Sequence, residues 1–456
     1  MAELLSVGLD VGTTTTQMIL SRLQVENRAS SFAVPQLEIV SREILYESPI
    51  HFTPLLDGQR IDGAAIRSIV EKEYARAGIC REQVDTGAVI ITGETSRKEN
   101  AKAVLESLAG FAGEFVVTTA GPDLESVLAA KGAGAVRYSE EMGKTVLHFD
   151  IGGGTSNWAL IQSGKIIKTG CMNVGGRLIK LDKQGIVTYV SPVLDGLTHI
   201  QVGDRVTEDQ LEEVAELLVQ ALEMVAGMRE GTQLLDKLTT EESSHRGAAV
   251  TDTGDLVISF SGGVADCIAQ AKPWLDYGDI GPVLGQKIRE SRLCKASFVL
   301  GNQTIRATVI GAGCHSAQLS GSTVFYRNVQ LPMKNLPVVE TIGDLSRLDG
   351  PGVLAIKGME NPSYDQVKTL ANQIGDGISG QVFVALRADM AKALGHALKL
   401  RLGDAVPILC IDGVALREGD FLDVGKPVGP ALPVVIKTMI FSKEVESVDS
   451  ENKTIR

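Results

Sequence analysis

The chain has 456 residues, of which 44% are hydrophobic, and a formal net charge of −12. This is the composition of a soluble globular protein, and the length indicates about three domains. The acidic balance argues against a protein that wraps nucleic acid, because that function needs a positive surface. Glycine, at 49 residues, is abundant and indicates many tight turns or sites lined by backbone.

No targeting or membrane segment is expected. The first residues, MAELLSVGLDVG, contain neither a basic region nor a sustained apolar run. No uncharged apolar stretch approaches the ~18 residues needed to span a bilayer. We therefore expect a cytoplasmic protein without a membrane partner.

The cysteines and His148 indicate no metal site. The six cysteines are scattered without a CxxC pair, so neither a zinc site nor a disulfide framework is predicted. They stand at Cys80, Cys171, Cys267, Cys294, Cys314 and Cys410. His148 lies in an apolar strand pattern and is expected to be a hydrogen-bonded core histidine.

A weak internal repeat is the main feature of the first 160 residues. Residues 4–20, LLSVGLDVGTTTTQMIL, and residues 145–161, TVLHFDIGGGTSNWALI, both read as strand, turn, strand. Their turns align as LDVGTTTT and FDIGGGTS. The repeat predicts a duplicated α/β architecture with two facing halves, and the cleft between them is the expected binding site.

The chemistry of the two turns favours a shared ligand over two plain hairpins. Aspartate and glycine are common in any turn, but both turns also repeat a run of small or hydroxyl residues. Glycines allow close approach of backbone N–H groups to an anion, and threonine hydroxyls add donors. Asp10 and Asp150 would repel a phosphate, so we expect Mg²⁺ between them, bound mostly through its waters. The pair predicts a metal–phosphate site.

Other phosphate-like motifs are rejected. GKT at 143–145 resembles the end of a P-loop, but Tyr138 stands where the first glycine belongs and a strand follows. GAG at 132–134 and GAG at 311–313 lack the last glycine of the dinucleotide fingerprint. The third Asp-x-Gly, at 423–425, has no hydroxyl run after it and is interpreted as a turn.

Five ordered blocks resemble the actin, Hsp70 and sugar-kinase superfamily over about residues 1–330. They are LDVGTTTT, a helix at 122–131, FDIGGGTS, FSGGVADCI at 260–268 and VIGAGCHSAQLSG at 309–321. They resemble that superfamily's first phosphate loop, first connecting helix, second phosphate loop, adenosine loop and second connecting helix. The resemblance implies an actin-like ATPase fold of two RNase H-like α/β halves around a nucleotide cleft.

The same resemblance implies ATP and Mg²⁺ as cofactors and assigns site residues. Asp10 and Asp150 would face the metal. Contacts to phosphate or adenosine are implied for Gly12, Thr13, Thr14, Thr15, Gly152, Gly153, Gly154, Thr155, Gly262 and Gly263. Glu125 would orient the attacking water, unless it is only a solvated helix acid, and Glu94 is a second candidate. No lysine matches the phosphate-contacting lysine of the chaperones.

Later segments complete the domain plan. Thr207 to Gln210 form a capping box that opens an amphipathic helix with a core-facing side. After about residue 335, strands and helices alternate and predict an appended α/β domain. Their segments are VLAIK at 353–357, a helix near 363–374, QVFVAL at 381–386, a helix near 389–402 and PILCID at 407–412. The predicted domains are 1–143, 144–330 and 335–456.

The whole chain is similar to the family of ethanolamine ammonia-lyase reactivating factors. The similarity lies in TGETSRKENA at 92–101, AGPDLESVLAAKGAGA at 120–135, NVGGRLI at 173–179 and DVGKPVGPALPVVIKTMIF at 423–441. It implies a chaperone-like ATPase that binds the lyase holding inactive cobalamin and promotes exchange for adenosylcobalamin, cycling between ATP and ADP. An association with the microcompartment of ethanolamine utilisation is a further expectation.

Three alternatives stay open at the level of sequence. A reactivase of a related diol dehydratase would use the same loops, although its large subunit is longer. A small-molecule kinase would need a substrate pocket with a positioned base, and no motif indicates one. An ATP-gated interaction module would show little turnover.

Overall fold

The computed structural model describes most of the chain and divides it into two compact units. The described residues are 2–12, 15–27, 37–56, 60–92, 100, 104, 108, 116–119, 122–241, 243–248, 255–295, 297–301, 304–315, 318–319, 324–345, 348, 350–378, 380–416, 418, 420–425, 427 and 432–438. The larger unit comprises residues 3–24 and 40–317, and the smaller one comprises residues 1–2, 25–39 and 318–456.

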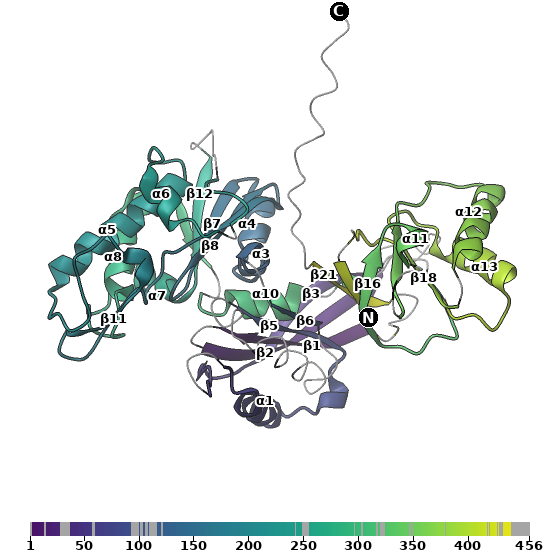
Figure 1. Cartoon of the computed structure of the whole chain (residues 1–456), viewed down its shortest axis with the longest axis horizontal. Coiled ribbons are helices and arrows are strands. Elements are labelled where there is room, and N and C mark those ends of the chain that lie inside the picture. The colour runs from purple at the N-terminus through teal and green to yellow at the C-terminus, as the bar shows by residue number, and fades with distance from the viewer. Residues whose placement is uncertain are drawn as a thin grey trace, which may run out of the picture. The chain divides into compact units, whose positions relative to one another are not determined.

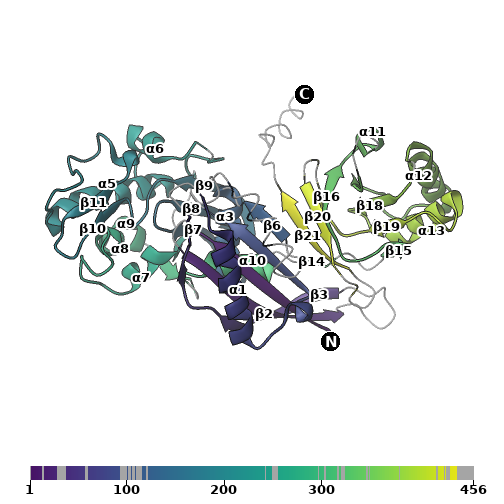
Figure 2. The ribbon, with the colours of Figure 1, turned by 60° about the horizontal axis from the view of Figure 1, so that its bottom comes forward.

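The first sheet contains the start of the chain. Its strands are β1 (Ala2–Val11), β2 (Thr15–Asn27), β3 (Leu37–Glu47), β4 (His51–Phe52), β5 (Thr86–Ile91) and β6 (Val116–Thr119). The order across the sheet is β3-β2-β1-β5-β6, with β4 paired to β2. Helix α1 (Gly63–Ala77) packs its apolar side on this sheet, where Ile66 and Val70 join Val7 and Leu9 in one core (Figure 2).

The second sheet repeats this plan. Its strands are β7 (Thr145–Ile151), β8 (Ser156–Gln162), β9 (Lys165–Met172), β12 (Leu256–Ser261) and β13 (Phe298–Leu300). Their order is β9-β8-β7-β12-β13. Strands β7, β8 and β9 therefore correspond to β1, β2 and β3 of the first sheet, and β12 and β13 correspond to β5 and β6. The predicted duplicated α/β architecture is confirmed.

Helices and a small ribbon surround the second sheet. They are α4 (Ala135–Met142), β10 (Ile179–Leu181), β11 (Val187–Val190), α5 (Glu208–Val225), α6 (Gln233–Leu238), α7 (Gly263–Ala269), α8 (Gly281–Glu290) and α9 (Arg292–Lys295). Helix α5 begins at the predicted capping box, in which Thr207 and Gln210 exchange hydrogen bonds. Its predicted core face is confirmed, because residues such as Leu211 and Leu218 are fully buried.

The two connecting helices are exchanged between the sheets. Helix α3 (Pro122–Gly132) follows the first sheet but packs on the second, where the Ser126 hydroxyl donates to the Gly170 carbonyl at 3.2 Å. Helix α10 (Ala307–His315) follows the second sheet but packs on the first, where the Ser6 hydroxyl donates to the Gly313 carbonyl at 2.5 Å (Figure 1). The exchange ties the two halves of the large unit together.

Glycines allow α3 and α10 to touch at their backbones. A Cβ atom on Gly132 would lie 1.8 Å from the Ala307 carbonyl oxygen, and one on Gly311 would lie 2.0 Å from that of Leu128. Any side chain at either position would force the helices apart. The two GAG segments, rejected as dinucleotide fingerprints, are therefore helix-crossing points.

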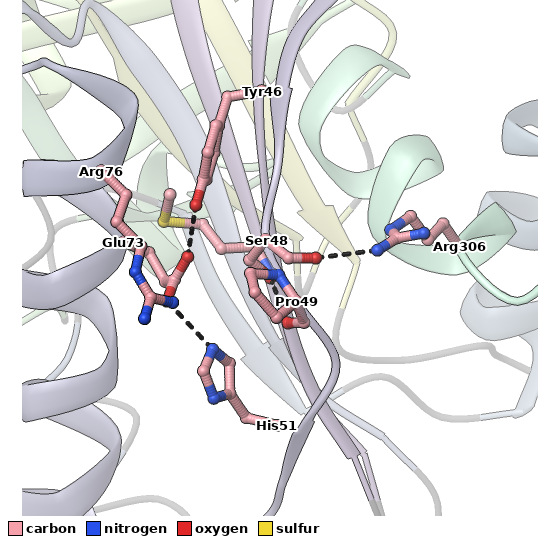
Figure 3. A network of polar contacts seen from close by, with 8 residues as sticks. Tyr46, Ser48, Pro49, His51, Glu73, Arg76 and Arg306 are labelled. Carbon is pink, nitrogen blue, oxygen red and sulfur yellow. Dashed lines mark hydrogen bonds and ion pairs between the residues drawn. The ribbon is translucent and has the colours of Figure 1, made fainter.

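A buried acid organises the edge of the first sheet. The Glu73 carboxylate of α1 is fully buried and accepts a hydrogen bond from the Tyr46 hydroxyl at 2.5 Å. It also forms an ion pair with Arg76 at 2.7 Å and lies 3.0 Å from His51 Nε2 (Figure 3). This network fixes the segment between β3 and β4 on α1.

The smaller unit is built on a mixed sheet with the order β14-β21-β20-β16-β17-β18-β19-β15. Its elements are β14 (Gln318–Leu319), β15 (Phe325–Arg327), β16 (Met333–Val339), α11 (Ile342–Leu345), β17 (Val353–Ile356), α12 (Tyr364–Gly377), β18 (Val382–Leu386), α13 (Ala391–Leu402), β19 (Ile408–Ile411), β20 (Asp420–Val424) and β21 (Pro433–Thr438). The predicted alternation of strands and helices is confirmed. Strands β16 to β19 are parallel, and α12 and α13 cover one face of them.

Within the described residues, no helix is both long enough and apolar enough to cross a membrane.

Candidate functional site

The first predicted phosphate loop joins β1 to β2. The Gly12 N–H donates to the Thr15 carbonyl at 2.9 Å and closes the turn, and the Thr53 hydroxyl donates to the Gly12 carbonyl at 2.7 Å. A Cβ atom on Gly12 would lie 3.1 Å from the Thr15 oxygen, so the turn favours glycine there. Thr13 and Thr14 lie outside the described residues.

The second loop, between β7 and β8, closes in the same way. The Gly152 N–H donates to the Thr155 carbonyl at 2.9 Å, which matches the bond in the first loop. No atom of the described residues lies within 4 Å of a Cβ atom built on Gly154, so its backbone is open to a ligand on that side. The turn of the first loop is therefore repeated in the second, as the sequence repeat predicts.

Residues 173–177 support the second loop from outside. The Gly176 and Arg177 N–H groups donate to the Gly152 and Gly153 carbonyls at 3.0 and 2.6 Å. A Cβ atom on Gly175 would lie 2.4 Å from the Gly153 oxygen, so only glycine allows this contact. The NVGGR segment, noticed in the sequence only through family resemblance, packs directly against the loop.

Each aspartate is held by a hydroxyl from the neighbouring parallel strand. Asp10 is the last but one residue of β1, and its Oδ1 accepts a hydrogen bond from the Thr92 hydroxyl, just beyond β5, at 2.9 Å. Asp150, at the end of β7, accepts from the Ser261 hydroxyl of β12 and from Thr308 of α10 at 3.4 Å. The two halves thus present their carboxylates in matching local environments.

The charge of Asp150 acts on Asp10. The pKa of Asp10 is raised to about 7, mainly by burial; the charge of Asp150 also raises it, and the hydrogen bond from Thr92 lowers it. Burial also raises the pKa of Asp150 to about 6, against hydrogen bonds from Ser261 and Thr308. The fold therefore brings together two acids that are costly to ionise side by side without a cation.

His148 belongs to the support of Asp150. Its Nδ1 lies 3.0 Å from the Ser259 hydroxyl and its Nε2 lies 3.0 Å from the Ser261 hydroxyl, which donates to Asp150. Burial lowers the pKa of His148 to about 3, so the ring is neutral at physiological pH. The predicted hydrogen-bonded core histidine is confirmed.

Glu125 of α3 is held beside the second loop. Its Oε2 accepts a 2.8 Å hydrogen bond from Asn157 Nδ2, and Asn157 pairs across the β7–β8 ladder with Asp150. Glu125 is half-buried, so it is not simply a solvated helix acid. Glu94, the second candidate, lies outside the described residues.

Two buried amides occupy equivalent places after the two loops. Gln17 and Asn157 each stand seven residues after the loop aspartate. Both are about 95% buried, and neither Gln17 Oε1 nor Asn157 Oδ1 has a hydrogen-bond partner among the described residues. A buried amide oxygen without a partner is costly, so these two acceptors mark places where a ligand or its water would be stabilised.

The predicted adenosine loop follows Ser261 directly. Gly262 has φ +85° and donates its N–H to the Thr304 carbonyl at 2.9 Å. A Cβ atom there would lie 2.3 Å from the Ile151 carbonyl oxygen, next to Asp150. Gly263 begins α7, and in the part of the chain that the structure describes no atom lies within 4 Å of a Cβ atom built on it. Gly262 is thus needed by the fold, whereas Gly263 presents open backbone.

The donor set suits Mg²⁺ with retained waters. Among the described residues, no three His, Cys, Asp or Glu side chains cluster as a metal cage. Two facing aspartates with raised pKa values are the sparse carboxylate set typical of a magnesium ion that also binds phosphate oxygens. The residues therefore fit a hydrated metal–phosphate complex better than a dedicated protein cage.

The raised pKa values predict that Asp10→Asn changes the pH dependence of stability. An unfolded chain releases the Asp10 proton near pH 3.8, whereas the folded protein holds it to about pH 7. The folded state binds more protons between these values, so Asp10 lowers the free energy of unfolding as pH rises from about 4 to 7.

Without metal, the free energy of unfolding of Asp10→Asn should therefore exceed that of the parent at pH 8, by on the order of 2 kcal/mol. The gain should shrink at pH 5. Denaturant unfolding in EDTA at both pH values measures this, and an equal gain at both would contradict it.

Sequence reasoning missed the residues that support the aspartates. Thr92, Ser261 and Thr308 are separated from the loops they contact by 82, 111 and 158 positions. Asn157 carried a local signal, since it follows the second loop in the same place as Gln17 follows the first.

Comparisons with known proteins give the relatives of this chain. A family model described as "Ethanolamine utilisation protein EutA" matches residues 2–442. The chain is similar to the ethanolamine ammonia-lyase reactivase EutA of Escherichia coli (strain K12), with 38% identity, covering 96% of this chain and 99% of that protein. The Salmonella typhimurium reactivase EutA is 37% identical with the same coverage. Among solved structures, the chain is similar to the Aquifex aeolicus PPX-GPPA enzyme, with 13% identity, a TM-score of 0.41, and coverage of 68% of this chain and 99% of that one.

Proposed function

Because this chain belongs to the family of ethanolamine utilisation protein EutA, we propose that it is the ATP-dependent reactivating factor of adenosylcobalamin-dependent ethanolamine ammonia-lyase. The two curated relatives are named for that activity, and the similarity covers 99% of each of them. The observation that carries the nucleotide part is the matched pair of loops, each with an aspartate held by a hydroxyl from the next strand.

The site residues have distinct proposed roles toward Mg–ATP. Asp10 and Asp150 would hold Mg²⁺, which would neutralise the charge of the aspartates and of the phosphates. The backbone of residues 12–15 and 152–155 would line the phosphates, and the N–H groups of these loops that do not close the turns would donate to them. Gly263 offers open backbone to adenosine. Gln17 Oε1 and Asn157 Oδ1, which have no partner among the described residues, would accept hydrogen bonds from water near the phosphates.

Glu125 is proposed to orient the attacking water. Asn157 Nδ2 holds one carboxylate oxygen at 2.8 Å and places the acid beside the second loop. A carboxylate in this position would accept a proton or a hydrogen bond from the water. The lone pair of the water oxygen would then point toward the terminal phosphate.

Glu125→Gln should slow ATP hydrolysis without removing ATP binding. The amide keeps the shape of the side chain but loses the charge that polarises water, and removal of one general base typically costs 10²–10⁴-fold. We expect at least about a 100-fold lower turnover with a nucleotide affinity within about threefold of the parent. Glu141→Gln is the matched control, since Glu141 forms an exposed ion pair with Arg137 on α4. Equal hydrolysis by Glu125→Gln and the parent would remove Glu125 from the mechanism.

A short segment before α10 can transmit the nucleotide state. The Thr304 carbonyl accepts from Gly262, and the Thr304 hydroxyl donates to Asp266 of α7 at 2.5 Å. Two residues later, Arg306 donates to the Ser48 carbonyl of the first half at 2.8 Å (Figure 3). A shift of the adenosine loop would therefore move Arg306 and, through its hydrogen bond, the Ser48 segment of the first half, as in hinge closure around ligands.

The lyase is the proposed partner. Nucleotide state would bias affinity for the lyase that holds damaged cobalamin, and the shift can be no larger than the difference in affinity between the two states. The factor would loosen the cobalamin site so that the spent cofactor leaves and adenosylcobalamin enters. We further propose that residues 1–143 and 144–330 act as the two moving halves, that residues 335–456 form a separate domain, and that the protein works in the cytoplasm at the ethanolamine-utilisation microcompartment.

Release of cyanocobalamin from the stalled lyase tests this function. The lyase is loaded with cyanocobalamin, desalted and mixed with this protein, and the free corrin is measured by its absorbance after filtration. Release that requires both this protein and Mg–ATP is expected. Retention of the corrin, together with ATP consumption that depends on an added small hydroxyl or carboxyl acceptor, would instead favour a kinase.

A further inference from the structure

Four charged residues stand in a row at the carboxyl edge of the parallel strands in the smaller unit. Each is the first residue after its strand: Glu340 after β16, Lys357 after β17, Arg387 after β18 and Asp412 after β19. These strands are neighbours in that order. Ligands of open α/β sheets bind outside the carboxyl ends of the strands, so this edge is where a site is expected.

The two central cations lie side by side. Beyond the ends of the strands, the Arg387 N–H donates to the Ile356 carbonyl at 3.3 Å and the Ala388 N–H donates to the Lys357 carbonyl at 3.1 Å. Lys357 and Arg387 are both exposed, and within the described part of the chain neither forms an ion pair with a carboxylate. Like charges on neighbouring strands repel, so a bound anion would stabilise the pair.

Asp412, by contrast, already accepts a hydrogen bond from the protein backbone. Its side chain is fully buried, and its Oδ2 accepts a hydrogen bond from the Ala391 N–H at the start of α13 at 3.2 Å. It therefore supports the helix. The charges left at the rim are the acid Glu340 and the two cations, which sum to +1.

A cavity of about 390 Å³ opens between these side chains. Its rim contains Glu340, Lys357 and Arg387, and its floor is apolar. The floor residues are Ala355, Ile356, Ala385, Val414 and Leu416. A second cavity of about 450 Å³, between the end of β17 and α12, shares Ile356 with the first. The volume of the first cavity is at the small end of the range for sites that hold organic ligands.

We propose that this crevice binds a small organic phosphate, separately from the nucleotide site of the large unit. A phosphate dianion offers enough oxygens and charge for both cations, and a guanidinium beside an ammonium suits it well. A carboxylate has only two oxygens and one charge, so it offers the guanidinium and the ammonium fewer charge-assisted hydrogen bonds than a phosphate does. The carbon part of the ligand lies on the apolar floor. Glu340 excludes ligands that carry additional negative charge on its side.

Titration of the intact protein with phenyl phosphate tests the proposal. Phenyl phosphate supplies a dianion and an apolar ring, benzoate supplies the ring with a carboxylate, and inorganic phosphate supplies the dianion alone. Calorimetry in EDTA at pH 8 and low salt should show phenyl phosphate binding at least about fivefold more tightly than either of the others.

Variants locate the site. Arg387→Gln and Lys357→Gln should each weaken phenyl phosphate at least about fivefold, with circular dichroism unchanged because both side chains are exposed. Arg401→Gln is the matched control, since Arg401 of α13 is exposed and already paired with Asp376. Binding that survives both cation variants would overturn the crevice as the site. Equal affinity for benzoate would overturn the assignment to phosphates.

Discussion

Asp10→Asn is expected to lower the affinity for Mg–ATP by about 30-fold or more. Asp10 and Asp150 stand next to the two loops, close enough for the charge of Asp150 to act on Asp10. Removing one of two charges that face a bound cation typically costs at least 2 kcal/mol. The asparagine can still accept the 2.9 Å hydrogen bond from Thr92, so the loop itself should keep its shape. Calorimetric titration with Mg–ATP at pH 8 measures the effect.

The control for Asp10→Asn is Asp236→Asn. Asp236 forms an exposed ion pair with Arg246 at the surface of the second half, so its loss should leave nucleotide affinity unchanged. If Asp10→Asn titrates Mg–ATP as the parent does, the assignment of the two loops is wrong. Loss of affinity in both variants would indicate a general electrostatic effect of net charge.

Gly262→Ala is expected to destabilise the fold by about 2–4 kcal/mol. The residue has φ +85°, where a side chain is strained, and its Cβ atom would lie 2.3 Å from the Ile151 carbonyl oxygen. Strain and overcrowding each cost about 1–3 kcal/mol. The melting temperature should therefore fall by roughly 5–10 °C, and nucleotide binding should weaken because Ile151 adjoins Asp150.

Gly263→Ala is the matched comparison one residue later. None of the described residues comes within 4 Å of its Cβ atom, and its place in the first turn of α7 accepts alanine. Its melting temperature should equal or slightly exceed that of the parent. If adenosine lies against this backbone, a methyl group should still weaken ATP by about tenfold. Unchanged affinity in Gly263→Ala would contradict the adenosine-loop assignment.

The sequence predicted the parts of the site that are local. The two Asp-x-Gly loops, the helix at 122–131 and the alternating elements after 335 each depend on turn chemistry or on a pattern within one segment. Local rules were enough because glycine, aspartate and hydroxyl residues have strong backbone preferences in turns. The core role of His148 also followed from its apolar neighbours.

What the sequence could not predict depends on pairing between distant segments. Thr92 and Ser261 meet the aspartates only because β5 and β12 pair with β1 and β7. The exchange of α3 and α10 between the sheets leaves no periodic signal, since it is decided by which backbones fit at Gly132 and Gly311. The cations Lys357 and Arg387 are 30 positions apart and come together through parallel register alone.

The most direct test of the whole account is recovery of a stalled lyase. Ethanolamine ammonia-lyase inactivated with cyanocobalamin is mixed with this protein, Mg–ATP and adenosylcobalamin, and acetaldehyde production is followed over time. We predict that activity returns only with this protein and Mg–ATP together, and that Asp10→Asn fails where Asp236→Asn succeeds. No recovery by a protein that binds Mg–ATP normally, or equal recovery with Asp10→Asn, would contradict the account.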